Sequence, residues 1–395
     1  MEVEPVKNLR IHLYGVQGSG STFPSRKERN AFQELTDLDL LNQVFADMMR
    51  RTQGTGQVHC NIEEILGGPV NRQSLLAYRK TLLTHDPRVY GGWTTCAWIE
   101  TGDGHDIVLD CGSGFRNCAK DLQAKWGERY ERHLHIFGSH SHLDHTEGFD
   151  QAAVCFDSRN CVHVYGNHQF LRALDVSLGI FSRHVDDQMY GMQTPVFFGV
   201  MPAKFDACEI RDLNAQPPQA DEELSQRTHH IGRPVVIGRT RITAFEVFHP
   251  APCLAYRFEH GGKVFVFCTD HELRRGSDPH HPNQKASMAA EKRLREHSNG
   301  ADLLYRDGQY SLVEYQGFQG IGGTGATSRM DWGHSCMEDV RDMARECGVK
   351  QTLIGHHDPN RDWSERTWID STFAQSTGDG NGRVELASAE TVFDL

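Results

Sequence analysis

Four residues that can bind a metal ion lie within a window of six positions, 140–145. Imidazole nitrogens and carboxylate oxygens bind divalent metals such as zinc, and a tight turn after a strand would hold them rigidly. The residues just before the window, 134–137, alternate apolar and polar side chains as a strand does. A solvated loop is the alternative, because the chain contains 23 histidines, but an aspartate placed between histidines favours a metal site. The four candidate ligands are His140, His142, Asp144 and His145.

Three more candidate ligands stand in the second half of the chain. His249, Asp270 and His356 each follow a run of apolar residues that predicts a strand. At the last position the adjacent His357 is an alternative ligand, and the sequence does not choose between the two. A single histidine or aspartate at the end of a strand is usually structural, so a metal site depends on whether the whole set comes together.

The elements that must position these residues are a series of strands in both halves of the chain. The first strand runs into a glycine-rich loop at 15–21, whose spacing fits neither a dinucleotide fingerprint nor a Walker loop, so we interpret it as a strand-to-loop turn. The interval 151–240 is expected to be irregular. The chain is expected to finish with one helix and a terminal strand, 383–386. The first predicted strand is 11–15, and the strands predicted between it and the terminal strand include 107–110, 134–137, 242–248, 253–258, 264–268 and 351–355.

Residues 25–88 differ from their surroundings and are interpreted as a helical insertion. Thr36 or Asp37 could cap the start of its first helix. A second amphipathic stretch over 75–83 is expected to end at Asp86-Pro87, because proline disfavours helical geometry in the residue before it. The insertion could be a lid over a pocket or a dimer interface, and both roles stay open. The apolar face predicted for the first helix is Leu38, Leu41, Val44, Phe45 and Met48.

Composition limits the classes of function. The chain has 395 residues, a net charge of −12 and a mean hydropathy of −0.55, which describes a globular protein. No apolar run approaches membrane-spanning length. The eleven cysteines include no Cys-x-x-Cys pair, so we expect reduced thiols and a cytoplasmic location. An acidic chain is a poor partner for long nucleic acids, although a small phosphorylated substrate is not excluded.

The pattern His-x-His-x-Asp-His at 140–145 resembles the signature turn of metallo-β-lactamase-fold hydrolases. The segments 91–96 and 110–114, and the order in which His249 and Asp270 follow the turn, also resemble that family, in its ribonuclease Z-like and cyclic-nucleotide phosphodiesterase-like branch. The resemblance implies an α/β fold, a four-layer αββα sandwich. It implies a single domain over 1–395, with the helical insertion 25–88 within it. Asp110 would support the turn through hydrogen bonds rather than bind metal.

The same resemblance implies a centre with two divalent metal ions, zinc first and manganese as the alternative. A hydroxide bridging the two ions would be the nucleophile. Asp270 would bridge them, and Asp144 would also orient the hydroxide. One ion would be held by His140, His142 and His249, and the other by Asp144, His145 and His356.

His334 resembles the histidine of a His-Ser or His-Thr pair that acts as a general acid in the phosphodiesterase branch. Asp307, at the end of the preceding predicted strand, would orient its imidazole and keep it protonated. Ser335 and Glu338 have the spacing of a capping box for the following helix. In the same relatives the loop after the first strand lies near the metals, which makes Ser19 and Ser21 candidate substrate contacts.

Two enzymatic functions and one non-catalytic function remain. We expect a phosphodiesterase that opens small cyclic nucleotides, because the interval 146–248 contains a single lysine, Lys204, and so lacks a basic arm for transfer RNA. The alternative is a ribonuclease Z-like endonuclease acting on transfer-RNA precursors. A metal-stabilised binding protein without activity is the third hypothesis. The expected partners are a small phosphodiester and, at most, a second copy of the chain, with no extended nucleic-acid surface and no membrane.

Overall fold

The computed structural model describes residues 6–20, 26–52, 61–82, 88–185, 194–215, 227–375 and 382–395. The chain divides into two compact units. The main unit comprises Met1–Phe23 and Tyr90–Leu395, and the helical unit comprises Pro24–Val89. Leu83, Asp86-Pro87 and Ser21, which were singled out in the sequence, lie outside the described residues.

One sheet of the main unit, sheet 1, has eight strands in the order β15-β1-β2-β3-β4-β5-β6-β7. Neighbouring strands from β3 to β7 are parallel, whereas the pairs that β1 makes with β2 and with β15 and the β2–β3 pair are antiparallel. The strands are β1 (Leu9–Gly15), β2 (Cys96–Thr101), β3 (Asp106–Leu109), β4 (Arg132–Phe137), β5 (Asn160–Gly166), β6 (Lys204–Arg211), β7 (Arg227–His230) and β15 (Thr391–Asp394).

The second sheet, sheet 2, has seven strands in the order β14-β13-β12-β11-β10-β9-β8. The pairs β11–β12, β12–β13 and β13–β14 are parallel, and the pairs β8–β9, β9–β10 and β10–β11 are antiparallel. The strands are β8 (Pro234–Ile237), β9 (Thr240–Val247), β10 (Cys253–His260), β11 (Lys263–Cys268), β12 (Leu303–Asp307), β13 (Gln351–Gly355) and β14 (Arg383–Leu386).

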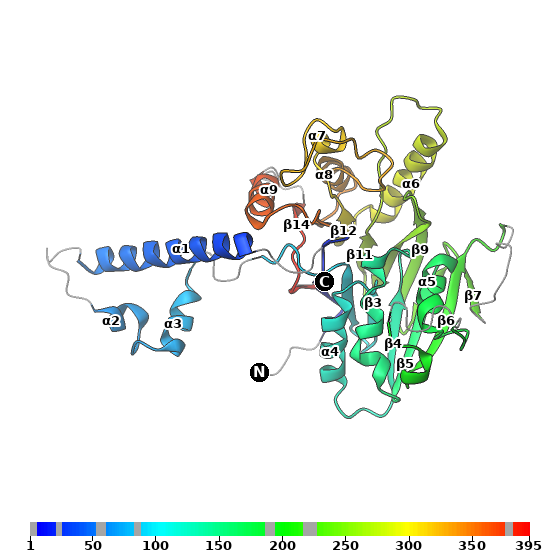
Figure 1. Cartoon of the computed structure of the whole chain (residues 1–395), viewed down its shortest axis with the longest axis horizontal. Coiled ribbons are helices and arrows are strands. Elements are labelled where there is room, and N and C mark those ends of the chain that lie inside the picture. The colour runs from blue at the N-terminus through cyan, green and yellow to red at the C-terminus, as the bar shows by residue number, and fades with distance from the viewer. Residues whose placement is uncertain are drawn as a thin grey trace. The chain divides into compact units, whose positions relative to one another are not determined.

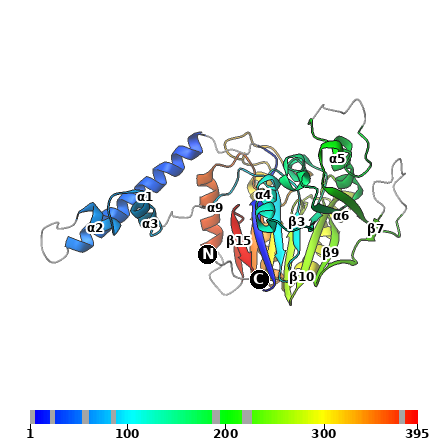
Figure 2. The ribbon, with the colours of Figure 1, turned by 90° about the horizontal axis from the view of Figure 1, so that it is seen from below.

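The two sheets pack face to face, and helices cover the outer face of each (Figures 1 and 2). Side chains such as Ile11, Phe137, Tyr256 and Phe267 fill the space between the sheets. Helices α4 (Phe115–Trp126) and α5 (His168–Leu178) pack on sheet 1, and α6 (Pro282–Ser298), α8 (Met337–Glu346) and α9 (Trp363–Gln375) pack on sheet 2. This four-layer arrangement confirms the predicted αββα sandwich.

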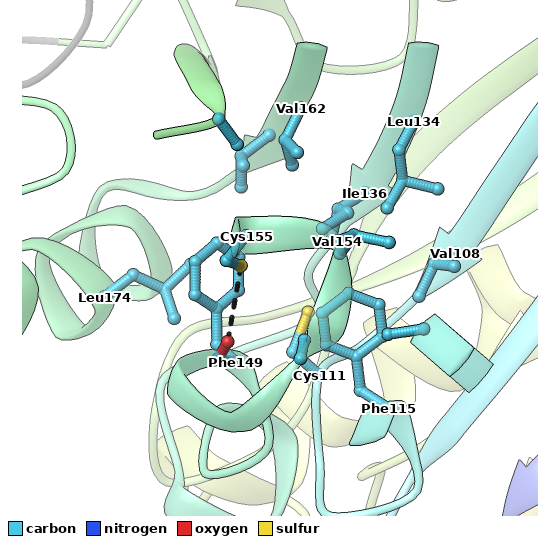
Figure 3. Close-up of a cluster of buried hydrophobic side chains, with 14 of the residues drawn as sticks. Val108, Cys111, Phe115, Leu134, Ile136, Phe149, Val154, Cys155, Val162 and Leu174 are labelled. Carbon is cyan, nitrogen blue, oxygen red and sulfur yellow. Dashed lines mark hydrogen bonds between the residues drawn. The ribbon is translucent and has the colours of Figure 1, made fainter. Parts of the chain in front are cut away.

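The outer core of sheet 1 fixes the strand that delivers the first ligand turn. Ile136 of β4 and Val108 of β3 pack against Phe115 of α4 (Figure 3). The adjoining segment continues this core, where the Cys155 thiol donates to the carbonyl of Phe149 at 3.5 Å. Alternating apolar residues on β4 therefore bury one face here, as the sequence pattern indicates.

The helical unit has a small core of its own. Helix α1 (Arg26–Thr52) packs through Leu40, Val44 and Met48 against α2 (Ile62–Leu66) and α3 (Arg72–Arg79). The predicted cap at Thr36 or Asp37 is wrong, because α1 begins ten residues earlier and the Thr36 hydroxyl bonds back to the carbonyl of Gln33. The predicted apolar face is also wrong in part, since Leu38, Leu41 and Phe45 are exposed.

Two further predictions about the elements need correction. The interval 151–240 is not irregular, because it contains β5, α5, β6, β7 and β8. The signal was present in β5, where Val162 and Val164 alternate with polar residues and are buried. The terminal strand 383–386 is confirmed as β14, but one more strand, β15, follows it and pairs with β1.

The remaining general predictions concern cysteines and membranes. The ten cysteines within the described residues are free thiols, nine of them buried. Among the same residues, none of the helices combines the length and the apolar character that crossing a bilayer requires.

Candidate metal centre

All seven predicted ligands lie at one edge of the sandwich. The turn that carries four of them follows β4 in sheet 1, and the other three follow β9, β11 and β13 in sheet 2. These three strands run in the same direction, so their carboxyl ends meet at the same edge. Residues that are more than 200 positions apart in sequence, such as Asp144 and His356, thereby come within 3.2 Å.

Asp110 holds the ligand turn in place from the end of β3. Its carboxylate accepts hydrogen bonds from the backbone N–H of Ser139 at 2.6 Å, the Ser139 hydroxyl at 2.8 Å and Nδ1 of His145 at 2.8 Å. Asp110 is fully buried and has a positive φ of 56°. The structure therefore confirms that Asp110 supports the turn.

Three histidines form one part of the cluster, which we call the triple-histidine half. Nδ1 of His142 lies 2.9 Å from Nε2 of His140 and 3.2 Å from Nε2 of His249. Oδ2 of Asp270 faces the same point, 3.4 Å from His140 and 3.7 Å from His249. His142 is exposed and the other three residues are buried.

The other part, which we call the Asp144 half, contains an additional carboxylate. Nε2 of His356 lies 3.2 Å from Oδ2 of Asp144 and 3.2 Å from Oδ1 of Asp270. Nε2 of His145 lies 3.5 Å and 3.3 Å from the same two oxygens. Asp270 thus turns one oxygen toward each half, which is the position a bridging ligand needs.

The hydrogen bonds of the histidines show that this donor set suits metal ions. The Nε2 atom of His145 is buried and has no hydrogen-bond partner among the described residues, although a buried polar nitrogen normally has one. Because Nδ1 is engaged elsewhere in three of the rings, their Nε2 lone pairs are directed at the centre. Nδ1 of His145 bonds to Asp110, Nδ1 of His249 bonds to the carbonyl of Gly333, and Nδ1 of His356 bonds to Oε1 of Gln309.

The two halves differ in the direction in which the pKa values of their histidines are shifted. Burial lowers the pKa of His140 and lowers that of His249 to about 3. Burial also lowers the pKa of His356, but the carboxylates of Asp270 and Asp144 outweigh it and raise that pKa to about 9. The pKa of His145 is raised in the same way. The Asp144 half therefore attracts positive charge strongly, and a metal ion can supply it.

Two glycines allow the ligands to take these positions. At Gly333, with φ of 96°, a Cβ would lie 2.1 Å from Nδ1 of His249. At Gly18 a Cβ would lie 2.6 Å from Cε1 of His356. Both contacts are far inside van der Waals distance, so only glycine fits. The glycine-rich loop after β1 follows the strand as the predicted strand-to-loop turn, and Gly18 in it also packs against the ring of His356. Ser19, in the same loop, lines a cavity beside the cluster.

His356, rather than His357, faces the cluster. Nε2 of His357 bonds to the carbonyl of Ala387 at 2.7 Å, and the ring is buried away from the ligands. His356 has a positive φ of 57°, the left-handed conformation that turns its side chain toward Asp144 and Asp270.

His334 and Asp307 form a pair next to the cluster. Nδ1 of His334 lies 2.8 Å from Oδ2 of the fully buried Asp307, and its ring stacks on that of His356 at a centroid distance of 4.7 Å. The predicted capping box is wrong. Cys336 is the N-cap of α8, and the Ser335 hydroxyl donates instead to the carbonyl of His271.

A cavity of about 270 Å³ opens beside the cluster. His142, Asp144, Asp270, His334 and His356 contribute to its wall. Seven other wall residues were not predicted, because their types and spacing form no recognisable ligand or catalytic motif. Some of these residues are close to the His334 motif in sequence, and that proximity was a signal that could have found them. The missed residues are Gln309, Tyr310, Arg329, Trp332, Asp358, Pro359 and Asn360.

Comparison with known proteins gives the family to which the chain belongs. A family model described as "Beta-lactamase superfamily domain" matches residues 105–357. No curated protein matches the chain. Solved structures with the same fold include Zn²⁺-bound PqqB from Methylobacterium extorquens, with 12% identity, a TM-score of 0.51, and coverage of 98% of this chain and 100% of that one.

Two further structures are more remote in shape. The short form of human tRNase Z has 13% identity and a TM-score of 0.49, with 97% of this chain and 98% of that chain covered. Yeast PDE1 has 12% identity and a TM-score of 0.48, with 78% and 96% covered. At such identities the similarity shows the fold alone. The family match spans more than half of the chain, with all seven candidate ligands and His334 inside it, so this chain belongs to the β-lactamase superfamily, a fold family composed mostly of metal-dependent hydrolases.

Proposed function

We propose that this protein is a phosphodiester hydrolase with a dinuclear metal centre and that its substrates are small cyclic nucleotides. The observation that carries the proposal is the His334–Asp307 pair, which stands beside a set of seven converging ligands and lines the same cavity. A metal-ligand set alone would suit many hydrolytic reactions. A fixed histidine next to it adds a proton donor, which alkoxide leaving groups require.

Each residue has a distinct task in this proposal. The triple-histidine half would hold one divalent ion, the Asp144 half another, and Asp270 would contact both. When bound, the ions would lower the pKa of water and withdraw charge from a phosphoryl oxygen. Asp144 lines the cavity, so its carboxylate can also accept a hydrogen bond from the attacking water and orient it.

His334 would protonate the departing oxygen. Its Nδ1–H donates to Asp307, so Nε2 is the nitrogen left to carry a proton into the cavity. Asp307 is held by further hydrogen bonds from the backbone N–H of Gln309 at 3.0 Å and of His271 at 3.3 Å. These bonds fix the carboxylate, and the carboxylate fixes the imidazole ring.

The size of the cavity and the net charge of the chain support a small substrate. The cavity volume of about 270 Å³ lies just below the usual range for ligand sites, which is about 300–1,000 Å³. The net charge of −12 and the single lysine between the turn and His249 argue against a long RNA, whose phosphates need many cations.

A substrate panel tests this proposal. Metal-loaded protein would be assayed on cyclic mononucleotides, cyclic oligonucleotides and precursor transfer RNA, each with added zinc or manganese. We expect ring opening of the cyclic substrates to linear products and little or no cleavage of the RNA. Efficient RNA cleavage without activity on any cyclic nucleotide would overturn the choice in favour of a ribonuclease Z-like endonuclease.

A further inference from the structure

Arg329, which has no acidic partner among the described residues, lines the same cavity. The guanidinium of Arg329 lies 4.3 Å from the ring centroid of Trp332 and 6.0 Å from that of Tyr310. Within the part of the chain that the structure describes, this guanidinium makes neither a hydrogen bond nor an ion pair. The buried arginines nearby differ, because Arg306 and Arg361 each pair with a glutamate. Aromatic rings hold the Arg329 cation in position without neutralising it.

Trp332 is exposed although its loop is firmly held. Half of its surface, 50%, is accessible. On either side of it, the backbone N–H groups of Asp331 and Gly333 both donate to the buried carboxylate of Glu272 at 2.9 Å. Arg274 adds a two-pronged ion pair to Asp331, at 2.7 and 3.1 Å. A large apolar ring is therefore kept in contact with water at the cavity wall by a loop that has little freedom to bury it.

We propose that Trp332 and Arg329 form a subsite for a nucleobase and a second phosphate, so that the substrate is a nucleotide with at least two phosphate groups, as in a cyclic dinucleotide. This inference rests on the proposed function, because it takes the phosphodiester that reacts to lie at the metal cluster. The indole stacks on a base, a contact that any base can make. The guanidinium binds the second phosphate, for which its planar fork of donors is suited.

The charges in the cavity support a second anionic group. Asp144 and Asp270 belong to the cluster, and Asp358 accepts a hydrogen bond from Gln309. None of these carboxylates pairs with Arg329 among the described residues, although all line the same cavity. The reacting phosphate would be neutralised by the cluster. Arg329 therefore remains available for an anion elsewhere on the ligand.

Binding to the metal-loaded protein tests the subsite. Calorimetry would measure the affinities of adenosine 5′-monophosphate, adenosine 3′,5′-bisphosphate and inorganic phosphate. We expect the bisphosphate to bind at least several-fold more tightly than the monophosphate. Arg329→Ala should remove that difference, and Arg329→Lys should restore part of it. Trp332→Ala should weaken both nucleotides roughly tenfold, the usual effect of losing one base stack, without changing the affinity for inorganic phosphate.

Controls separate this inference from the proposed function. Phe318→Ala removes an aromatic residue that is 78% exposed and does not line the cavity, so it should change none of the affinities. Equal affinities for the two nucleotides in the wild type, or a preference that survives Arg329→Ala, would overturn the subsite. If the wild type hydrolyses neither ethyl 4-nitrophenyl phosphate nor any cyclic nucleotide but shows the expected binding pattern, the proposed function fails and the subsite stands.

Discussion

The two halves of the metal centre share Asp270 but differ in charge and in access to water. The triple-histidine half has no carboxylate of its own, includes the exposed His142, and contains histidines whose pKa is lowered. The Asp144 half is buried, and the pKa of His145 and His356 is raised by the neighbouring carboxylates. The two halves are therefore not equivalent as positions for a cation. The Asp144 half should bind a cation first and release it last.

The largest expected effect comes from removing the residue that the halves share. Asp270→Ala deletes the two carboxylate oxygens, one of which faces each half, so we predict less than one metal ion per chain and hydrolysis reduced to background. Elemental analysis after dialysis against the metal measures the metal content, and steady-state rates measure hydrolysis. If the variant retained two ions, Asp270 would not be the bridge. Asp302→Ala, which changes a carboxylate outside the cluster that pairs with Lys350, is the control.

A smaller effect is expected when one half alone is disturbed. In Gly333→Ala a Cβ would collide with Nδ1 of His249, so the triple-histidine half should lose its ion while the Asp144 half keeps one. Gly323→Ala is a matched control, because Gly323 also has a positive φ, of 82°, but no atom of the described residues lies within 4 Å of its Cβ position. Metal content near one for the first variant and near two for the control would support unequal halves. Complete loss of metal from Gly333→Ala would contradict the comparison.

The smallest expected effect is the release of protons when the protein binds metal. In the metal-free protein the pKa of His356 is raised from 6.5 to about 9, so its extra proton stabilises the fold below pH 6.5, and that stabilisation is lost as pH rises through about 9. Near neutral pH an entering metal ion must displace this proton. We predict proton release on metal loading, measured by calorimetry in buffers of different ionisation enthalpy.

Asp144→Asn is the control for that measurement. The substitution removes one of the carboxylates that raise the pKa of His356 and keeps the shape of the side chain. Fewer protons should then be released per ion bound. Unchanged proton release in Asp144→Asn, or none in the wild type, would show that the Asp144 half does not hold the extra charge.

The sequence predicted the place of a residue in the fold where one local pattern determines that place. Asp270 and His356 come together because both follow parallel-running strands of sheet 2, whose carboxyl ends meet at one edge. The turn after β4 of the facing sheet 1 brings His140 to the same place. The sandwich was predictable for the same reason, together with the family resemblance. Asp307 was predicted through the family resemblance, which places an acidic residue on the strand before the His334 motif.

The features that were missed depend on packing between distant segments. Glu272 binds the loop around Trp332 across about 60 positions, and Gln309 meets His356 across 47. No periodicity encodes such contacts. The error in α1 has a different cause, since Leu38 and Leu40 both fit a helical face and only the partners α2 and α3 decide which face is buried.

The most direct test of the central claim compares the wild type with His334→Ala on two phosphodiesters, one with an alkoxide leaving group and one with a nitrophenolate. We predict that kcat/KM for the alkoxide ester falls by roughly 10²–10⁴, the usual contribution of a positioned general acid. The nitrophenyl ester should lose much less, because its leaving group needs no proton, and the metal content should not change. Equal losses on both esters would contradict the role assigned to His334.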